Sequence, residues 1–425
     1  MTDGNNYYAV AVKSGTLELR KKISGSTTVL ASTSYTFTAG TWYTIKLNVV
    51  GTTLTAYVNG TQALSTTASG LTSGVAGLIG WKTAVKFDDV VVTDGSGSTA
   101  TPTPTPTSGS SATPTPTPTT GSGSGSANFN LVGFATLNGG NTGGTGGTSV
   151  TVTTGTDLQA AIKLGGPRII YVNGTITTSN SSGLSKIDVK DVNNISIIGV
   201  GTKGELNGIG IKLMRTSNVI LRNLKIHHVL TGDNDCISIE GPVTNVWVDH
   251  CELYNQFDGV DKDYYDALLD AKADSSYLTY SWNKLHDSWK ASLCGSSESD
   301  TNDRRLTSHH NSFININSRL PLYRGGQGHI YNNYYYDVPT SAVNSRINAK
   351  LRVENNVFVN VNNPICSLDS DVIGYWDVRN NTFTNCTGNT PTSSTCSYTP
   401  SYAYTLESVS TVKSTVNNNA GVGKI

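Results

Sequence analysis

LTSHHNSF, at residues 306–313, identifies the fold, because similar segments recur before and after it. Each is a short run of β-branched or aromatic residues that ends in asparagine or an equivalent residue, then one residue, then an apolar one. The others are VILRNLKI (219–226), VWVDHCEL (246–253), LTYSWNKL (278–285), HIYNNYYY (329–336), RVENNVFV (352–359) and WDVRNNTF (376–383). An internal repeat of this kind indicates stacked structural units.

One column of the repeat carries the asparagines. It consists of Leu224, Cys251, Asn283, Asn311, Asn333, Asn356 and Asn381, at spacings of 27, 32, 28, 22, 23 and 25 residues. A period in the low twenties with variable insertions is typical of a β-solenoid, and neither a leucine-rich nor a helical period is present. An amide at each tight turn can hydrogen-bond its equivalent in the next coil. We therefore predict an all-β fold, a right-handed parallel β-helix.

The composition agrees with β structure and excludes several functions. Only 14% of the 425 residues are charged, and 44 are glycine, which suits strands and turns better than helices. Thirty Lys and Arg balance thirty Asp and Glu, so no basic surface for nucleic acid is expected. No apolar run approaches the roughly 20 residues of a membrane span. We expect a monomer with neither nucleic acid nor a membrane as partner.

Three parts are expected along the chain. Residues 99–126 read TATPTPTPTSGSSATPTPTPTTGSGSGS, a composition that cannot bury a core. We predict a module at residues 1–95, a linker at 96–127 and the β-helix domain at 128–425. Such linkers are typical of secreted carbohydrate enzymes. The start of the chain lacks the basic and apolar regions of a secretory signal, so we expect an extracellular protein whose signal peptide is not part of this chain.

The first module has the pattern of an antiparallel β structure. Its short alternating strands are YYAVAV (7–12), TLELRKK (16–22), TWYTIKLNVV (41–50), TTLTAYVNG (52–60) and VKFDDVVV (85–92). Residues 41–60 and 87–90 resemble the C-terminal half of a concanavalin-like (laminin G-like) sandwich. The resemblance implies a partial sandwich with a carbohydrate-binding role.

All six cysteines lie in the second half of the chain. An even count permits three disulfides, and the sequence cannot choose among the possible pairings. Cys386 and Cys396 enclose a turn-rich stretch and are the pair that we expect to be bridged. No C-x-x-C spacing indicates a structural zinc site.

Three basic residues stand at similar offsets from the repeat column. Lys290 follows Asn283 by 7 residues, while Arg319 and Arg324 follow Asn311 by 8 and 13. Because equivalent positions of neighbouring coils stack, we expect these side chains on one flank of the β-helix.

Four acidic residues are expected on the same flank. Asp233 and Asp235 are two positions apart, so both should point from one face of a strand. Asp266 ends an insertion, NQFDGVDKDYYD (255–266), and Asp270 follows four residues later. Oxygen ligands with no Cys or His nearby favour a hard cation, and Ca²⁺ fits best. Either pair alone would more often cap a turn; their position on neighbouring coils favours a metal.

Other polar and aromatic residues are expected to be structural. Asp249 and His250 lie inside a strand, where a buried hydrogen-bonded pair is expected. Trp282 and Trp289 should stack or pack in the core rather than bind sugar. Two adjacent histidine pairs could suggest zinc, but neighbouring residues of a strand point to opposite faces; these are His227-His228 and His309-His310.

The motifs around this flank resemble those of the family 1 polysaccharide lyases, the pectate lyases. They occur in order over residues 128–425 as NVWVDHCELY, DALLDAK, SWNKLHDSWKASLCGSSESD, LTSHHNSFININSRLPLYRGG and HIYNNYYY. The resemblance implies that Asp235, Asp266 and Asp270 hold Ca²⁺ and that Asp233 joins them when substrate is bound. Asp266 stands where some members of the family have Glu.

The resemblance also implies roles for the basic residues. Arg319, in NSRLP (317–321), would abstract the proton, while Lys290 and Arg324 would bind the substrate carboxylate. The C5 hydrogen of galacturonate is α to that carboxylate, and positive charge there stabilises the enediolate formed on proton loss. Loss of the C4 oxygen then cleaves polygalacturonate by β-elimination and leaves 4,5-unsaturated oligogalacturonates. Nearby cations would favour a neutral Arg319 and an alkaline optimum; a hydroxide that Arg319 positions is the alternative base.

Three other functions remain open from the sequence. A β-helix polygalacturonase would use Asp233 and Asp235 as acid and base, and a pectin lyase would act on esterified chains. A non-catalytic solenoid adhesin is the third, and the clustered Lys290, Arg319 and Arg324 argue against it.

Overall fold

The computed structural model describes residues 6–13, 15–38, 41, 43–71, 119–121 and 127–425. The chain divides into two compact units, Met1–Ser111 and Ala112–Ile425. The predicted strand at 85–92 and most of the predicted linker lie outside the described residues. In the part of the chain that the structure describes, no helix is long and apolar enough to cross a membrane.

The N-terminal unit contains two antiparallel sheets, with the strand orders β1-β2-β3 and β4-β5-β6. The strands are β1 (Tyr7–Lys13), β2 (Thr16–Ile23), β3 (Ser26–Ser34), β4 (Ile45–Val50), β5 (Thr53–Val58) and β6 (Thr61–Thr67). A small core joins the central strands through buried Leu17 and Leu19 on β2 and Leu54 and Val58 on β5. The sequence pattern does not predict the edge strands β3 and β6, because their Ser- and Thr-rich sequences lack apolar alternation.

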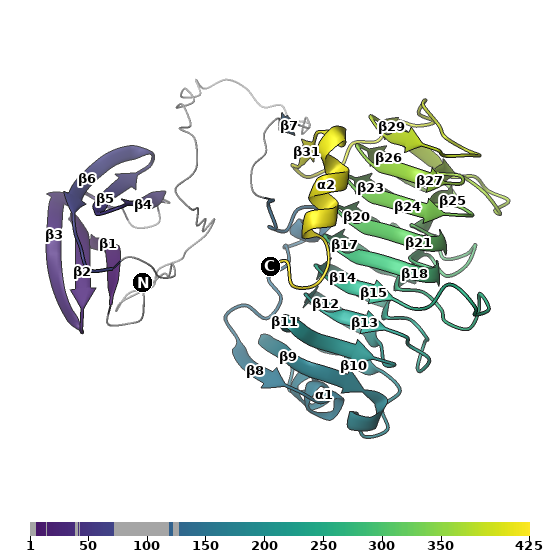
Figure 1. Ribbon diagram of the computed structural model, residues 1–425, viewed down its shortest axis with the longest axis horizontal. Helices are drawn as coiled ribbons and strands as arrows, with labels where there is room; N and C mark the ends of the chain where they lie inside the picture. Colours follow the sequence, from purple (N-terminus) through teal and green to yellow (C-terminus); the bar gives the residue numbers. More distant parts are fainter. Residues whose placement is uncertain (1–5, 14, 39–40, 42, 72–118, 122–126) are drawn as a thin grey trace. The chain divides into compact units, whose positions relative to one another are not determined.

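The second unit is a parallel β-helix of about nine turns. Its 23 strands form one sheet in which each coil pairs in parallel with the next, as the stacked arrows in Figure 1 show. The predicted right-handed parallel β-helix is confirmed. The strands are β8 (Thr148–Val152), β9 (Arg168–Thr177), β10 (Ile187–Lys190), β11 (Ile195–Asn207), β12 (Ile211–Arg222), β13 (Lys225–His227), β14 (Ile237–Asp249), β15 (Glu252–Tyr254), β16 (Leu269–Lys272), β17 (Ser275–Ser281), β18 (Lys284–Lys290), β19 (Leu293–Cys294), β20 (Arg305–His309), β21 (Ser312–Ser318), β22 (Leu322–Arg324), β23 (Gln327–Tyr331), β24 (Tyr334–Val338), β25 (Val343–Arg346), β26 (Lys350–Glu354), β27 (Val357–Val361), β28 (Ile365–Cys366), β29 (Tyr375–Arg379) and β30 (Thr382–Thr384).

The asparagine column forms the predicted ladder inside the β-helix. Each Nδ2 donates to Oδ1 of the next asparagine, at 3.0 Å from Asn283 to Asn311 and 3.1 Å from Asn311 to Asn333. The ladder continues at 3.0 Å through Asn356 to Asn381. Each Oδ1 also accepts the backbone N–H of the preceding member. The ladder thereby pairs polar groups that the turns would otherwise leave buried without partners.

Two helices cover parts of the β-helix. α1 (Gly155–Lys163) contributes Leu158 to the main core. α2 (Val409–Asn419) places Val412 and Val416 against β24 and β27. Both helices therefore contribute apolar side chains to the packing of the second unit.

A short strand of the second unit falls in the stretch predicted as linker, 96–127. Strand β7 (Thr119–Gly121) lies within that range but pairs in parallel with β31 (Thr405–Glu407). These three residues therefore belong to the second unit. The short helices η1 (Phe134–Thr136) and η2 (Thr178–Asn180) complete its elements.

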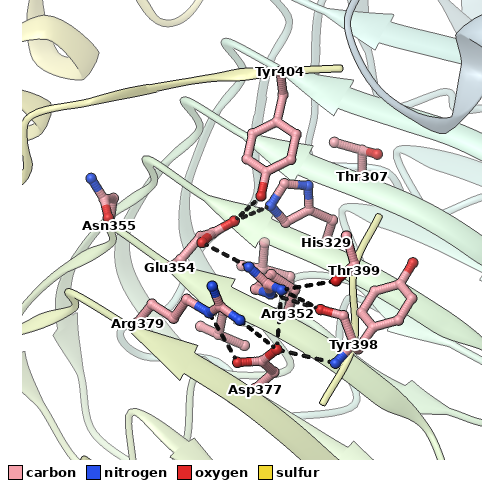
Figure 2. A network of polar contacts seen from close by, with 12 residues as sticks. Thr307, His329, Arg352, Glu354, Asn355, Asp377, Arg379, Tyr398, Thr399 and Tyr404 are labelled. Carbon is pink, nitrogen blue, oxygen red and sulfur yellow. Dashed lines mark hydrogen bonds and ion pairs between the residues drawn. The ribbon is translucent and has the colours of Figure 1, made fainter. Parts of the chain in front are cut away.

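A buried polar network binds the C-terminal segment to the β-helix (Figure 2). Glu354 lies at its centre: one carboxylate oxygen accepts a 2.6 Å hydrogen bond from the Tyr404 hydroxyl and lies 2.9 Å from Nε2 of His329. The other oxygen lies 3.3 Å from Arg352, which in turn contacts Asp377 at 3.1 Å. His329, Arg352 and Asp377 stack in register on β23, β26 and β29. Glu354 and the four partners named here are buried, so we assign the network a structural role.

Replacing Glu354 with glutamine should lower the free energy of unfolding by about 3 kcal/mol at pH 7, because buried Arg352 loses a charged partner. Burial would raise the pKa of Glu354, but the hydrogen bond from His329 and the other partners lower it to about 2. A lowered carboxyl pKa stabilises the fold above the unfolded value of 4.5, and this contribution disappears as the pH falls toward 2. Urea unfolding at pH 7 and pH 3 measures both effects.

Asp303→Asn is the matched control, since that carboxylate pairs with Arg305 on the surface and is 60% exposed. It should change the free energy of unfolding by less than about 1 kcal/mol. An equal loss in the two variants would show that the network contributes nothing beyond an ordinary surface pair.

The predicted disulfide between Cys386 and Cys396 is wrong: all six cysteines are free. The two residues pack in different places. Cys386 lies against the main core, with Sγ near the carbonyl oxygen of Phe358, whereas Cys396 packs with a separate cluster around Phe134. The turn-rich stretch between them leads the chain from one cluster to the other.

Candidate active site

Three of the predicted acidic residues, Asp235, Asp266 and Asp270, lie near enough to interact through their charges, and only Asp270 lies on a regular strand. Asp233 and Asp235 precede β14 in a turn, and Asn234 between them has a φ of 59°. Asp235 is buried whereas Asp233 remains partly exposed. The expectation that both point from one face of a strand is therefore wrong, because the left-handed residue turns the backbone. Asp266 lies in the loop before β16, and Asp270 lies on β16.

Asp235 and Asp270 meet at a third residue, Lys272. The Lys272 Nζ lies 2.8 Å from Oδ2 of Asp235 and 3.0 Å from Oδ2 of Asp270. The other oxygens accept backbone N–H groups from Ala267 at 3.0 Å and Leu293 at 2.8 Å. Backbone donors from two coils thereby hold both carboxylates in place.

Burial and mutual repulsion determine the charge state of these carboxylates. Burial and the neighbouring Asp270 carboxylate raise the pKa of Asp235 to about 7. Burial likewise raises the pKa of Asp270, and the charge of Asp266 contributes to both shifts. Burial would lower the pKa of Lys272, but the two carboxylates raise it above its usual value. Positive charge between Asp235 and Asp270 therefore stabilises their ionised forms.

Asp233 has a different set of partners. Lys186 Nζ lies 3.3 Å from its Oδ1, and Lys212 Nζ lies 2.8 Å from its Oδ2. Lys212 also pairs with Glu240. Each predicted metal ligand except Asp266 is thus held by lysines that the sequence pattern does not single out.

Of the three predicted cations, only Lys290 contacts one of these carboxylates among the described residues. Lys290 contacts Asp263 at 2.9 Å and Asp266 at 3.1 Å. Arg324 contacts Glu298 at 3.0 Å. Lys290 is the last residue of β18 and connects that strand to the inserted loop. Arg324 is the last residue of β22.

Arg319 differs from the other basic residues of the site. Among the described residues, its guanidinium has neither a hydrogen bond nor an ion pair, although Lys290 and Asp263 are near enough to interact with its charge. Its backbone is firmly placed, because the carbonyl accepts a 2.7 Å hydrogen bond from Ser292 and its φ is 67°. The unpaired guanidinium is therefore available to a ligand.

The donor chemistry of the site fits a hard cation. Asp233 Oδ2, Asp270 Oδ2 and the Ser238 hydroxyl are buried oxygens that accept no well-oriented hydrogen bond within the described residues. No three His, Cys, Asp or Glu side chains of the described residues converge as a complete metal site. The Lys272 ammonium group lies between Asp235 and Asp270. The site offers only oxygen donors, and its carboxylates repel one another. Both properties match the preference of Ca²⁺.

The residues expected to be structural are mostly confirmed as such. Asp249 and His250 are both buried, with His250 Nδ1 2.6 Å from Asp249 Oδ2. Trp282 is buried and stacks on His310 with ring centroids 4.2 Å apart. Trp289 packs edge-on against Phe257 and thereby supports the inserted loop.

The expectation that the adjacent histidines point to opposite faces is wrong. The Nδ1 atoms of His227 and His228 lie 2.6 Å apart, and those of His309 and His310 lie 2.8 Å apart. The second histidine of each pair has a positive φ, of 52° and 54°. This backbone turn brings the two rings together, whereas an extended strand would separate them.

Comparison with known proteins decides the family. A family model described as pectate lyase matches residues 120–425. The chain belongs to the pectate lyase family. A curated pectate trisaccharide-lyase from Bacillus licheniformis is 58% identical over 301 residues, which cover 70% of this chain and 88% of that protein. The family resemblance expected from the sequence is confirmed.

Solved pectate lyases share the fold. The crystal structure of one from a Bacillus species, in complex with trigalacturonate, has a TM-score of 0.67 and 42% identity, covering 69% of this chain and 99% of that one. Pectate lyase C from Erwinia chrysanthemi, determined with Ca²⁺, has a TM-score of 0.61 and 29% identity, covering 70% of this chain and 97% of that one.

The protein is therefore a polysaccharide lyase of the pectate lyase type. The alternatives of a hydrolase and of a non-catalytic adhesin are set aside. Sequence reasoning on this pectate lyase missed Lys272 and Lys212. Lys272 could have been found, because it stands two positions after Asp270 on β16 and so shares its face; no comparable signal marks Lys212.

Proposed function

We propose that this pectate lyase cleaves polygalacturonate by calcium-dependent β-elimination and releases 4,5-unsaturated oligogalacturonates. The observation that carries the proposal is the unpaired Arg319 guanidinium beside Lys290 and the loop of Asp266. A base needs a free side chain next to groups that bind the substrate carboxylate. Arg319 is the one basic residue of the predicted set that meets this condition among the described residues.

Known relatives support the substrate and the size of the product. Trigalacturonate binds the Bacillus pectate lyase, and pentagalacturonic acid binds a variant of pectate lyase C. The 58% identical relative is named for trisaccharide release. We therefore expect short oligogalacturonates, with trisaccharides prominent among the products.

The proposed reaction begins with removal of the C5 proton by Arg319 or by a hydroxide that it positions. Lys290 and Arg324 bind the carboxylate on C5 and stabilise the charge that develops on it. To do so, Lys290 would release Asp266 and Arg324 would release Glu298. The electrons released from the C5–H bond form the C4–C5 double bond. The glycosidic oxygen leaves C4 with the electrons of the C–O bond and takes up a proton from solvent. No attacking water is required.

The proposed calcium site uses Asp235, Asp266 and Asp270, with Asp233 joining when substrate is bound. Bound Ca²⁺ supplies positive charge beside the substrate carboxylate and so makes the C5 proton more acidic. The raised pKa of Asp235, about 7, supports the assignment, because a cation there offsets the repulsion between buried carboxylates.

The product tests the reaction type. Incubation with polygalacturonate should produce a near-ultraviolet absorbance from the unsaturated end, whereas hydrolysis would produce reducing ends alone. New reducing ends without that absorbance would contradict the proposal.

Methyl-esterified pectin should be a poorer substrate than polygalacturonate, because esterification removes the carboxylate that Lys290, Arg324 and Ca²⁺ bind. Initial rates of absorbance change on chains of rising esterification measure this preference. Equal or faster turnover of highly esterified pectin would instead indicate a pectin lyase.

We also propose that the enzyme acts outside the cell as a monomer, since its polymeric substrate is extracellular and the composition resembles that of secreted carbohydrate enzymes. The N-terminal unit is proposed to be a partial concanavalin-like module that binds carbohydrate. Retention of the full chain, but not of residues 128–425, on insoluble polysaccharide would support that role.

A further inference from the structure

Two lysines bind a single carboxylate at the edge of the candidate active site. One ammonium group contacts each oxygen of Asp233, from Lys186 at 3.3 Å and from Lys212 at 2.8 Å. A carboxylate is bound strongly when a positively charged group contacts each of its two oxygens. The Asp233 side chain thus shows that these lysines can form a carboxylate site, and about a quarter of the Lys186 side chain is open to solvent (28%).

Lys212 lies in line with the residues of the active site. It pairs in register with Ser238 on β14, which pairs in register with Asp270 on β16. Residues in register share one face, and neighbouring strands are about 4.8 Å apart, so Lys212 lies roughly 10 Å from Asp270 across two coils. The Ser238 hydroxyl between them is buried without a hydrogen-bond partner among the described residues. Polar groups therefore extend from the proposed reaction site toward the N-terminal coils.

We propose that Lys186 and Lys212 form an additional subsite for the carboxylate of a further galacturonate unit. The inference rests on the proposed function, since a polygalacturonate chain lying across the coils presents one carboxylate per unit. Asp233 occupies the subsite until it turns to the proposed metal site, and a substrate carboxylate then takes its place. Lys212 keeps Glu240 as a partner during this exchange. A short oligomer held at Arg319 does not reach the subsite, whereas a longer one does.

The test compares oligomers of two lengths. The Lys186→Met and Lys212→Met double variant keeps the apolar stems and removes both charges. It is made in the full chain with Arg319→Lys, so that ligands are not consumed. Calorimetry with Ca²⁺ present should show hexagalacturonate binding weakened about tenfold, while trigalacturonate binding changes less than about twofold. In the otherwise wild-type chain, KM for polygalacturonate should rise.

Two further variants make the outcome interpretable. Lys212→Arg keeps the charge and should retain most of the hexagalacturonate affinity. Lys225→Met is the matched control, because its side chain is also 28% exposed and pairs with one carboxylate, Glu205, on another face; it should change neither affinity. If the melting temperature of the double variant is lower than that of the wild-type chain, the single variant Lys186→Met is used in its place.

An equal loss for both oligomers would overturn the proposal, because the lysines would then act through Asp233 and the metal rather than on a distal unit. Unchanged hexagalacturonate binding would overturn it as well. Failure of the proposed function has a different result: the wild-type chain would form no unsaturated product from polygalacturonate.

Discussion

Replacing Arg319 with lysine should reduce kcat on polygalacturonate by about 100-fold or more, the usual scale for losing a positioned base. Lysine keeps the positive charge but lacks the planar guanidinium that can lie beside C5. KM should change little, because Lys290 and Arg324 still bind the carboxylate. The melting temperature should also stay constant, since the guanidinium has no hydrogen bond or ion pair within the described residues to lose. Absorbance kinetics and a melting curve measure both.

Two further variants show whether the fall in kcat is specific to Arg319. Arg215→Lys, at a surface pair with Asp191, is the matched control and should leave kcat unchanged. Lys290→Ala should raise KM as well as lower kcat, because in the proposed reaction Lys290 contacts the substrate carboxylate in both the ground and transition states. A folded Arg319→Lys variant with near-wild-type kcat would exclude Arg319 from the reaction. A lower melting temperature with unchanged kcat would show that Arg319 only packs in its turn.

Exhaustive chelation should lower the rate by at least about 100-fold, and added Ca²⁺ should restore it, because the metal stabilises developing charge by several kcal/mol. In the proposed calcium site the buried pair of Asp235 and Asp270 would provide oxygen donors, and a divalent cation would relieve their mutual repulsion. Mg²⁺ should substitute poorly, since it demands a smaller octahedral shell and retains its waters. The initial rate of absorbance change before and after chelation measures the effect.

Thermal melting provides a readout independent of activity. Ca²⁺ that binds the folded chain should raise the melting temperature in a concentration-dependent way. Asp270→Asn should abolish this increase, whereas Asp303→Asn, at an exposed pair away from the site, should retain it. Full activity after exhaustive chelation would contradict the calcium assignment.

The fold could be predicted from the sequence because a solenoid repeats its contacts at a nearly constant sequence separation. The asparagine column made the coils recognisable, and its amide ladder forms as expected from Asn283 to Asn381. The disulfide prediction failed for the opposite reason. Whether Cys386 and Cys396 meet depends on how the last coil and the C-terminal segment pack, and no repeat governs that packing.

The sequence pattern proposes the members of the candidate site but does not indicate how they pair. Stacking of equivalent positions predicts acidic and basic residues on one flank of the β-helix. It could not show that Lys272 stands between two carboxylates, or that Lys186 and Lys212 share Asp233. Such contacts depend on side-chain lengths and on turns such as the one at Asn234, whose left-handed backbone turns the two neighbouring aspartates toward different partners.

The repeat by itself therefore determined the parallel β-helix, because that fold depends on regular spacing along the chain. The tertiary structure alone decided that Arg319 has no side-chain partner among the described residues, and how Tyr404 and Tyr398 bind the buried Glu354 and Arg352 (Figure 2). Those contacts join segments about 50 residues apart. They depend on how the C-terminal segment packs on the β-helix, and this packing follows no repeat in the sequence.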